Sequence, residues 1–129
     1  MEMGLIIKPV EVIGDRDRVQ VQALFDTEAS ASFLRRDIAE SVATFSRWPA
    51  PWKFVLGDGK NTIEAQDFVG VHITIKGVTV FFPLLVVDQI GEEMIIGADM
   101  LQRWKIRLDP EKEEVFIDKK VTELKLMVA

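Results

Sequence analysis

One short segment of the chain combines the residue types that acid–base chemistry needs. Asp26 ends a run in which apolar and polar side chains alternate, and Thr27, Glu28, Ala29 and Ser30 follow it. A carboxylate just past a strand, on a loop that a threonine hydroxyl can hold, is suited to general acid–base work because the fold sets its direction. Aspartate and threonine are also common where strands turn, so this segment alone fits an ordinary turn equally well.

A second segment lies about seventy residues further along the chain. Two apolar residues and a glycine, Ile95, Ile96 and Gly97, precede a short helix that the pattern predicts over residues 98–104. Between the two segments the sequence predicts a hairpin over about residues 53–66, because two apolar runs flank a glycine-rich turn.

The tip of this hairpin carries Gly57, Asp58 and Gly59, followed by Lys60. Phosphate-binding loops are also rich in glycine, but they follow the spacings GxGxxG or GxxxxGK[ST] and open a helix. The tip has neither spacing and lies between two predicted strands. A hairpin turn is therefore the favoured interpretation.

Other reactive residue types are sparse. The single histidine, His72, falls on the polar side of an alternating strand, which favours a solvent-exposed side chain over a metal ligand. The chain has no cysteine, which excludes disulfides, thiol nucleophiles and cysteine metal sites. No serine lies in a GxSxG motif. The sequence predicts no metal and no cofactor.

Short strands with alternating side chains dominate the rest of the pattern. They are expected over residues 5–13, 18–25, 52–56, 61–68, 69–75, 78–87, 94–96, 106–108, 115–117 and 121–128. Besides the helix over 98–104, a helix is expected over 33–45 with Ser32 as its N-cap, and Pro49 and Pro51 end any helix beyond it. The apolar run 78–87 is expected to be buried on both faces. The fold class is all-β, a sandwich or a barrel.

The length and net charge of the chain limit the number of domains and the kinds of partner that it can have. The 129 residues, 48% of them hydrophobic, suit one domain over 1–129. Sixteen basic and 21 acidic residues give a net charge of −5 without a basic stripe, which argues against nucleic acid as a partner. The longest apolar run is too short to cross a bilayer, and the first residues lack the features of a signal peptide. We therefore expect no membrane association and a cytoplasmic protein.

The order of the three elements resembles the retropepsin-like aspartic proteases. This family includes retroviral proteases, the protease-like domain of ubiquitin-shuttle proteins and single-domain bacterial and archaeal relatives. The resemblance covers roughly residues 19–117: a strand leading into Asp26 and Thr27, the hairpin with its Gly-Asp-Gly tip, and the Ile95–Gly97 segment before a helix. It implies a closed acid-protease β-barrel with one or two short helices.

The resemblance also implies a function. A chain with a single Asp-Thr pair would work as a symmetric homodimer that cleaves peptide bonds, with Asp26 of each copy as the catalytic residue and Thr27 bracing the two loops. The hairpin would act as a flap over an extended peptide, through Gly57, Asp58 and Gly59. Ile95 would line the cleft, and Ile96 and Gly97 would be structural. The strand over 121–128 is a candidate dimer surface.

Glu28 departs from the family pattern, which has glycine at this position. Two Asp26 and two Glu28 around one axis would repel one another, which predicts an inactive or impaired enzyme. The glutamate is compatible with a natural pseudo-enzyme, an altered active enzyme or an introduced change. The alternatives to a peptidase are a non-catalytic peptide-binding or assembly module on the same fold, an unrelated β-sandwich and a cation site at the four carboxylates.

Overall fold

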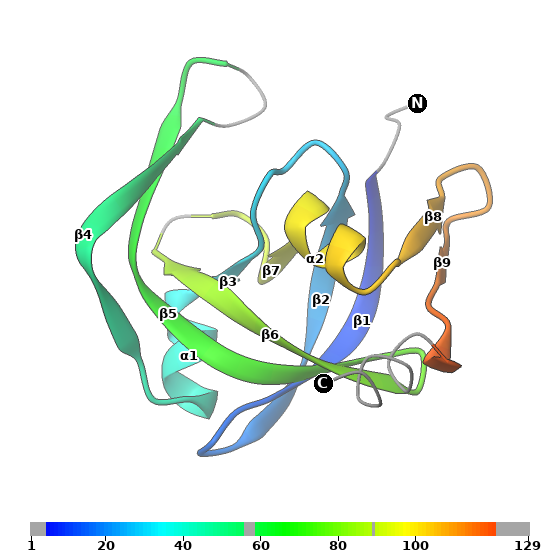
Figure 1. Ribbon diagram of the computed structural model, residues 1–129, viewed down its shortest axis with the longest axis horizontal. Helices are drawn as coiled ribbons and strands as arrows, with labels where there is room; N and C mark the ends of the chain where they lie inside the picture. The colour runs from blue at the N-terminus through cyan, green and yellow to red at the C-terminus, as the bar shows by residue number, and fades with distance from the viewer. Residues whose placement is uncertain (1–4, 56–58, 89, 121–129) are drawn as a thin grey trace.

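The computed structural model describes residues 5–55, 59–88 and 90–120 (Figure 1). Over these residues it contains nine strands and two short helices. The strands are β1 (Leu5–Ile13), β2 (Arg18–Asp26), β3 (Phe33–Arg35), β4 (Ser46–Val55), β5 (Thr62–Ile75), β6 (Val78–Val87), β7 (Met94–Ile96), β8 (Arg107–Asp109) and β9 (Glu114–Phe116). The helices are α1 (Arg36–Val42) and α2 (Ala98–Arg103).

Six of these strands close into a barrel. The main sheet has the order β1-β2-β7-β3-β6-β5-β4, and β1 also pairs with β5 through Val12 and Ile73, which closes the ring and leaves β4 outside it. Strands β8 and β9 form a separate hairpin. The expected all-β barrel with two short helices is therefore confirmed. No helix of the described residues is both long and apolar enough to cross a membrane.

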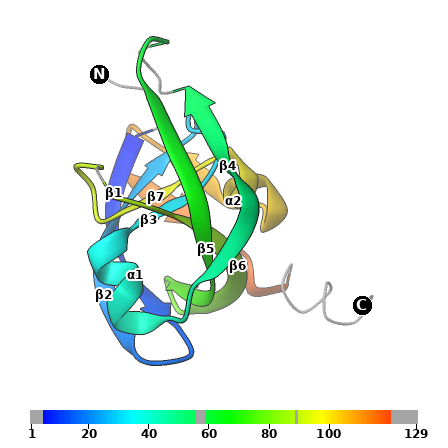
Figure 2. The ribbon, with the colours of Figure 1, turned by 90° about the vertical axis from the view of Figure 1, so that its left-hand side faces the viewer.

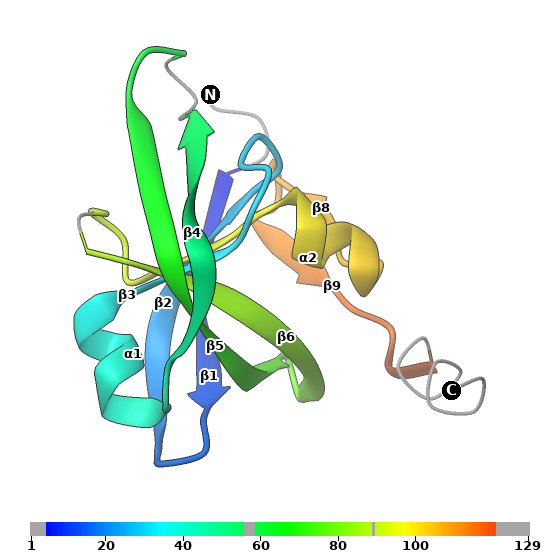
Figure 3. The same cartoon turned by 60° about the vertical axis from the view of Figure 1, so that its left-hand side comes forward.

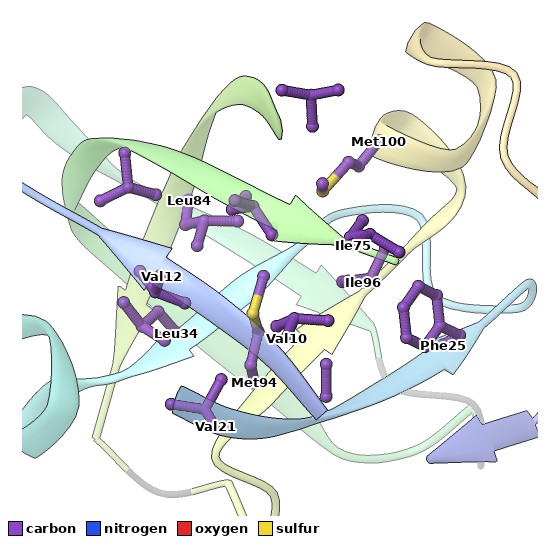
Figure 4. Packing of buried hydrophobic residues seen from close by; sticks show 14 of the residues in the cluster. Val10, Val12, Val21, Phe25, Leu34, Ile75, Leu84, Met94, Ile96 and Met100 are labelled. Carbon is purple, nitrogen blue, oxygen red and sulfur yellow. The ribbon is translucent and has the colours of Figure 1, made fainter. Parts of the chain in front are cut away.

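The β1–β2 hairpin forms as its alternating pattern predicts. The two strands are antiparallel over their whole length, from Leu5 opposite Asp26 to Ile13 opposite Arg18. Alternate residues such as Val21 and Phe25 are buried, because side chains of a strand point to opposite faces of the sheet. Figure 4 shows Val21 and Phe25 from β2 in one cluster with Met94 from β7 and Leu84 from β6.

The helix expected over 33–45 is only partly correct. Residues Phe33–Arg35 form β3, which pairs in parallel with β6 and antiparallel with β7, and α1 occupies only Arg36–Val42. Leu34, Ile38 and Val42 do have helical spacing, but Leu34 is fully buried as a strand residue inside the barrel. Tertiary pairing has overridden the local pattern.

The predictions around the next two strands also need correction. Strand β4 begins at Ser46, six residues before the expected start, and its register shifts between Arg47 and Trp52, around the two prolines. Proline is tolerated there because β4 is an edge strand. The strands expected over 61–68 and 69–75 are one strand, β5. Strand β6 alternates between buried and exposed residues in its first half and is not buried on both faces.

The β4–β5 hairpin extends beyond the barrel, as Figures 2 and 3 show. Strand β5 pairs with β6 only up to Asp67 opposite Val86, and from there to Thr62 it pairs with β4 alone. The expected positions of Gly57 and Asp58 at the tip, and of the strand over 121–128, lie outside the described residues.

Candidate active site

Asp26 and Gly97 leave the barrel side by side. Strands β2 and β7 run parallel, with Phe25 opposite Ile96, so the residues that follow them emerge at the same end of the sheet. The Asp26 carboxylate accepts a hydrogen bond at Oδ1 from the Glu28 backbone N–H, at 2.9 Å. The Ala29 N–H donates to the Asp26 carbonyl at 3.3 Å. These bonds fold the loop into a tight turn that orients the carboxylate.

Gly97 packs directly against the loop that follows Asp26. A Cβ at this position would lie 2.3 Å from the carbonyl oxygen of Ala31 and 2.6 Å from that of Ala29, so only glycine fits. The close approach lets the Ala98 N–H donate to the Ala29 carbonyl at 2.7 Å. Ile96, at 0% exposure, anchors the other side of this junction in the core.

A buried serine and a partly buried aspartate, a pair that the sequence did not predict, link the same two segments. The Ser32 hydroxyl donates to Asp99 Oδ1 at 2.7 Å and accepts from the Gly97 N–H at 2.9 Å, while the Ser32 N–H donates to Asp99 Oδ2 at 3.3 Å. Ser32 was expected to cap a helix; instead the N-cap of α1 is Arg35, without a side-chain cap bond. The available signal was Asp99 in the first turn of α2, two residues after the glycine.

A small pocket of about 100 Å³ opens beside Asp26. Five residues singled out in the sequence line it: Asp26, Glu28, Ala29, Ser30 and Ile95. Three apolar residues that the sequence did not single out complete it: Phe33, Phe54 and Val55. The rings of Phe33 and Phe54 meet edge to face, with centroids 5.4 Å apart. The carboxylate thus lies at the wall of an apolar pocket between the barrel and the β4–β5 hairpin.

Thr27 lies apart from this pocket. It is exposed and lines a separate groove with residues of α2 and the β8 region, among them Ala98, Leu101 and Leu108. At the hairpin tip, Gly59 is exposed and has a φ of 73°, a left-handed conformation that favours glycine. His72 is exposed, as expected, and its ring packs against Phe81.

An ion cluster holds the base of the β4–β5 hairpin. Asp67 is 5% exposed and accepts from Arg47 Nε at 2.8 Å and from Arg36 Nη2 at 3.0 Å. Arg36 also contacts Asp88. The hydrogen bond from Arg47 lowers the pKa of Asp67 below its ordinary value; burial opposes this effect, and the bond from Arg36 adds to it. The cluster joins β4 and β5 to α1 and the end of β6.

Within the described residues, no three histidine or acidic side chains are grouped as metal ligands would be. Asp26 and Glu28 are the two carboxylates at the pocket. Of these two, Asp26 is the one that a backbone N–H of the loop orients. A second oriented carboxylate would complete the arrangement for acid–base catalysis.

Comparisons with known proteins agree with this geometry. The family model of the Ty3 transposon peptidase matches residues 11–110. The retroviral protease-like domain of Ddi1 from Leishmania major is 19% identical with a TM-score of 0.63, over 91% of this chain and 90% of that one. EIAV protease, in complex with the inhibitor HBY-793, is 21% identical with a TM-score of 0.55, over 83% of this chain and 94% of that one.

A protein of unknown function from Legionella pneumophila shares the fold at 12% identity, with a TM-score of 0.53 over 82% of this chain and 91% of that one. No curated protein sequence matches the chain. The structural matches establish the fold, and the family model covers residues 11–110 of the 129. The chain belongs to the Ty3 transposon peptidase family of retropepsin-like proteins.

Proposed function

We propose that the protein is an aspartic endopeptidase that works as a homodimer, with Asp26 of each copy forming one catalytic pair. The observation that carries this proposal is the position of Asp26. Its carboxylate is oriented by the Glu28 N–H and lies in a pocket lined by apolar side chains of the barrel and of the β4–β5 hairpin. A single chain supplies one such carboxylate, so the second comes from the partner.

In this dimer the two Asp26 carboxyls share one proton. The ionised carboxylate takes a proton from a water molecule as the water oxygen attacks the carbonyl carbon of the peptide bond. The protonated carboxyl donates a hydrogen bond to the carbonyl oxygen, where negative charge develops. As the C–N bond breaks, the leaving nitrogen takes the proton that the first carboxylate removed from the water, and the two carboxyls again share one proton.

The β4–β5 hairpin serves as the flap in this proposal. A peptide in extended conformation lies between the hairpin and the loop after Asp26, and it adds backbone hydrogen bonds as a strand would. Ile95, Phe33 and Phe54 contact the side chains next to the cleaved bond, which favours apolar residues at those positions. Thr27, on the exposed side of the loop, faces the partner's loop. The cytoplasmic location stays a prediction.

Glu28 reduces this activity. It lies at the same pocket as Asp26, and a dimer places two copies of each carboxylate near one axis. Two unit charges about 4 Å apart repel by about 4 kcal/mol at an effective dielectric of 20. The repulsion disfavours either the dimer or the ionised catalytic carboxylate near neutral pH.

The test is cleavage of a mixed peptide library between about pH 4 and 7. Three proteins are compared: the chain as it stands, the Glu28→Gly variant, and the double variant that adds Asp26→Asn to Glu28→Gly. We expect Glu28→Gly to cleave peptides and the double variant to be inactive. If Glu28→Gly is a folded dimer and cleaves nothing, the proposal is wrong and a non-catalytic peptide-binding module takes its place.

A further inference from the structure

A basic pocket lies at the β8–β9 hairpin, on the side of the molecule away from the β4–β5 hairpin (Figure 1). It adjoins the groove that Thr27 lines, with which it shares Lys105, Arg107 and Asp118. It has a volume of about 280 Å³ and is lined by Val115, Phe116 and Ile117 of the β9 region. Lys76, Lys105 and Arg107 also line it, with Asp118 as the one acidic residue of the lining. Three cations against one anion give the pocket a charge of +2, in a chain whose net charge is −5.

The three cations come from three separate elements. Lys76 lies in the turn between β5 and β6, Lys105 follows α2, and Arg107 begins β8. Figure 1 shows the end of β9 close to the β5–β6 turn. Lys76 Nζ lies 5.8 Å from the ring centre of Phe116, and Arg107 Cζ lies 5.6 Å from it. Phe116 is 39% exposed, so the ring and the cations around it are open to solvent.

None of the three cations has an acidic partner among the described residues, whereas Arg18, Arg35, Arg36, Arg47 and Lys53 do. The sequence around Lys105 concentrates positive charge as well. Arg103, Lys105 and Arg107 occupy alternate positions, and no acidic residue lies between Asp99 and Asp109. No residue of this segment therefore neutralises its positive charge.

Both lysines of the pocket lie at positions where the backbone conformation favours glycine or asparagine. Lys105 directly follows the C-cap of α2 and has a φ of 53°. The Ile106 N–H donates to the Leu101 carbonyl, which closes the end of the helix around Lys105. In helix ends of this kind, glycine is the usual residue at the position of Lys105. Lys76 has a φ of 49° in the two-residue turn with Gly77, where asparagine, aspartate or glycine is usual. A cation near a helix C-terminus also stabilises the helix, but this does not explain Lys76.

From these observations we propose that the pocket is a docking site for an acidic peptide segment of a partner protein, separate from the peptidase cleft. Carboxylates of the segment would pair with Lys76, Lys105 and Arg107, and an apolar side chain would lie on Phe116. A nucleic acid fits less well, because its backbone needs a long basic stripe and the rest of this chain is acidic.

The test is fluorescence anisotropy with a labelled peptide of alternating glutamate and leucine. The matched control peptide has glutamine in place of glutamate. We expect the acidic peptide to bind, the neutral one to bind at least tenfold more weakly, and added salt to weaken the acidic peptide's affinity, as for any binding through charge. Arg107→Glu should lower the affinity about tenfold or more. Arg16→Glu makes an equal charge change on the β1–β2 turn, which lies away from β8 and β9 (Figure 1), and should leave the affinity within about twofold.

Two further variants separate binding from folding. Lys105→Gly and Lys76→Asn place favoured residues at the two left-handed positions, so we expect them to be at least as stable as the parent and yet to bind the peptide more weakly. The proposal is overturned if the neutral peptide binds as tightly, if Arg16→Glu loses as much affinity as Arg107→Glu, or if a single-stranded oligonucleotide binds more tightly than the acidic peptide. None of these outcomes depends on peptide cleavage.

Discussion

The Ser32 hydroxyl lies between Asp99 and the backbone of Gly97, donating to the first at 2.7 Å and accepting from the second at 2.9 Å. This one side chain joins the loop that carries Asp26 to the start of α2. Ser32 is 1% exposed, and its bond with the Gly97 N–H is buried. The orientation of the candidate catalytic loop therefore depends on a buried polar contact as well as on the sheet.

Removing this hydroxyl should destabilise the protein. Ser32→Ala leaves the buried Gly97 N–H without its partner and removes one of the two hydrogen bonds that Asp99 Oδ1 accepts, the other coming from the Met100 N–H. A buried polar group left unsatisfied costs about 1–3 kcal/mol. Chemical denaturation should show a loss of this size in the free energy of unfolding. Ser30→Ala, on the exposed part of the same loop, is the matched control and should change the free energy by less than about 0.5 kcal/mol. Equal losses for the two variants would contradict the proposed link.

A side chain at position 97 should be far more damaging. Gly97→Ala places a Cβ within 2.3 Å and 2.6 Å of two backbone oxygens, so the loop or α2 has to move. We expect a loss of about 3 kcal/mol or more in the free energy of unfolding, because backbone atoms cannot shift as a flexible side chain can.

The control for this substitution is Gly91→Ala, where a Cβ meets no atom within 4 Å. It should be neutral or slightly stabilising, since alanine restricts the unfolded chain more than glycine does. Thermal unfolding of the two variants side by side distinguishes them. A stable, well-folded Gly97→Ala variant would show that the close approach is not required.

The Asp67 cluster predicts a loss of stability in acid. Bonds from Arg47 and Arg36 lower the pKa of Asp67 in the folded protein, so its contribution is complete above the ordinary value of 3.8 and is lost as the pH falls through the lowered pKa. Asp67→Asn should reduce the free energy of unfolding by about 1–3 kcal/mol at pH 7 and flatten its decline below about pH 4.

The measurement is urea denaturation at a series of pH values. Glu40→Gln, on the exposed side of α1, serves as the control and should leave the shape of the curve unchanged. If Asp67→Asn follows the parent curve at every pH, the cluster does not stabilise the base of the hairpin.

The charge and the size of Glu28 can be separated. Glu28→Gln keeps the size of the side chain and removes the charge, whereas Glu28→Gly removes both. If repulsion with Asp26 is the cause of impairment, Glu28→Gln should recover at least tenfold in kcat/KM near neutral pH, since each 1.4 kcal/mol relieved is worth a factor of ten. Recovery in Glu28→Gly alone would instead assign the impairment to bulk at the pocket.

Much of the barrel could be predicted because its strands show their alternation locally. The β1–β2 hairpin is the clearest case, with Val21 and Phe25 buried as the pattern required. Strand β3 could not be predicted, because Leu34 continues the helical spacing of Ile38 and Val42. Its strand conformation is set by pairing with β6 and β7, which lie far away in the sequence.

The same distinction applies to the site. Asp26 and Gly97 were predicted from their local motifs, and the parallel pairing of β2 with β7 brings them together. The bond between Ser32 and Asp99 joins residues 67 positions apart, and neither residue lies in a local pattern that predicts contact with the other. Phe33 and Phe54 reach the pocket from β3 and β4, so their contact depends on how the β4–β5 hairpin packs against the barrel.

The pairing of two Asp26 residues in one site can be tested by titrating Glu28→Gly with a peptide that carries a hydroxyl group mimicking the tetrahedral intermediate. Calorimetry gives the number of ligands bound per chain. We predict one ligand for every two chains, and no binding when Asp26→Asn is added to the same protein. One ligand per chain, or binding that survives Asp26→Asn, would contradict the central claim.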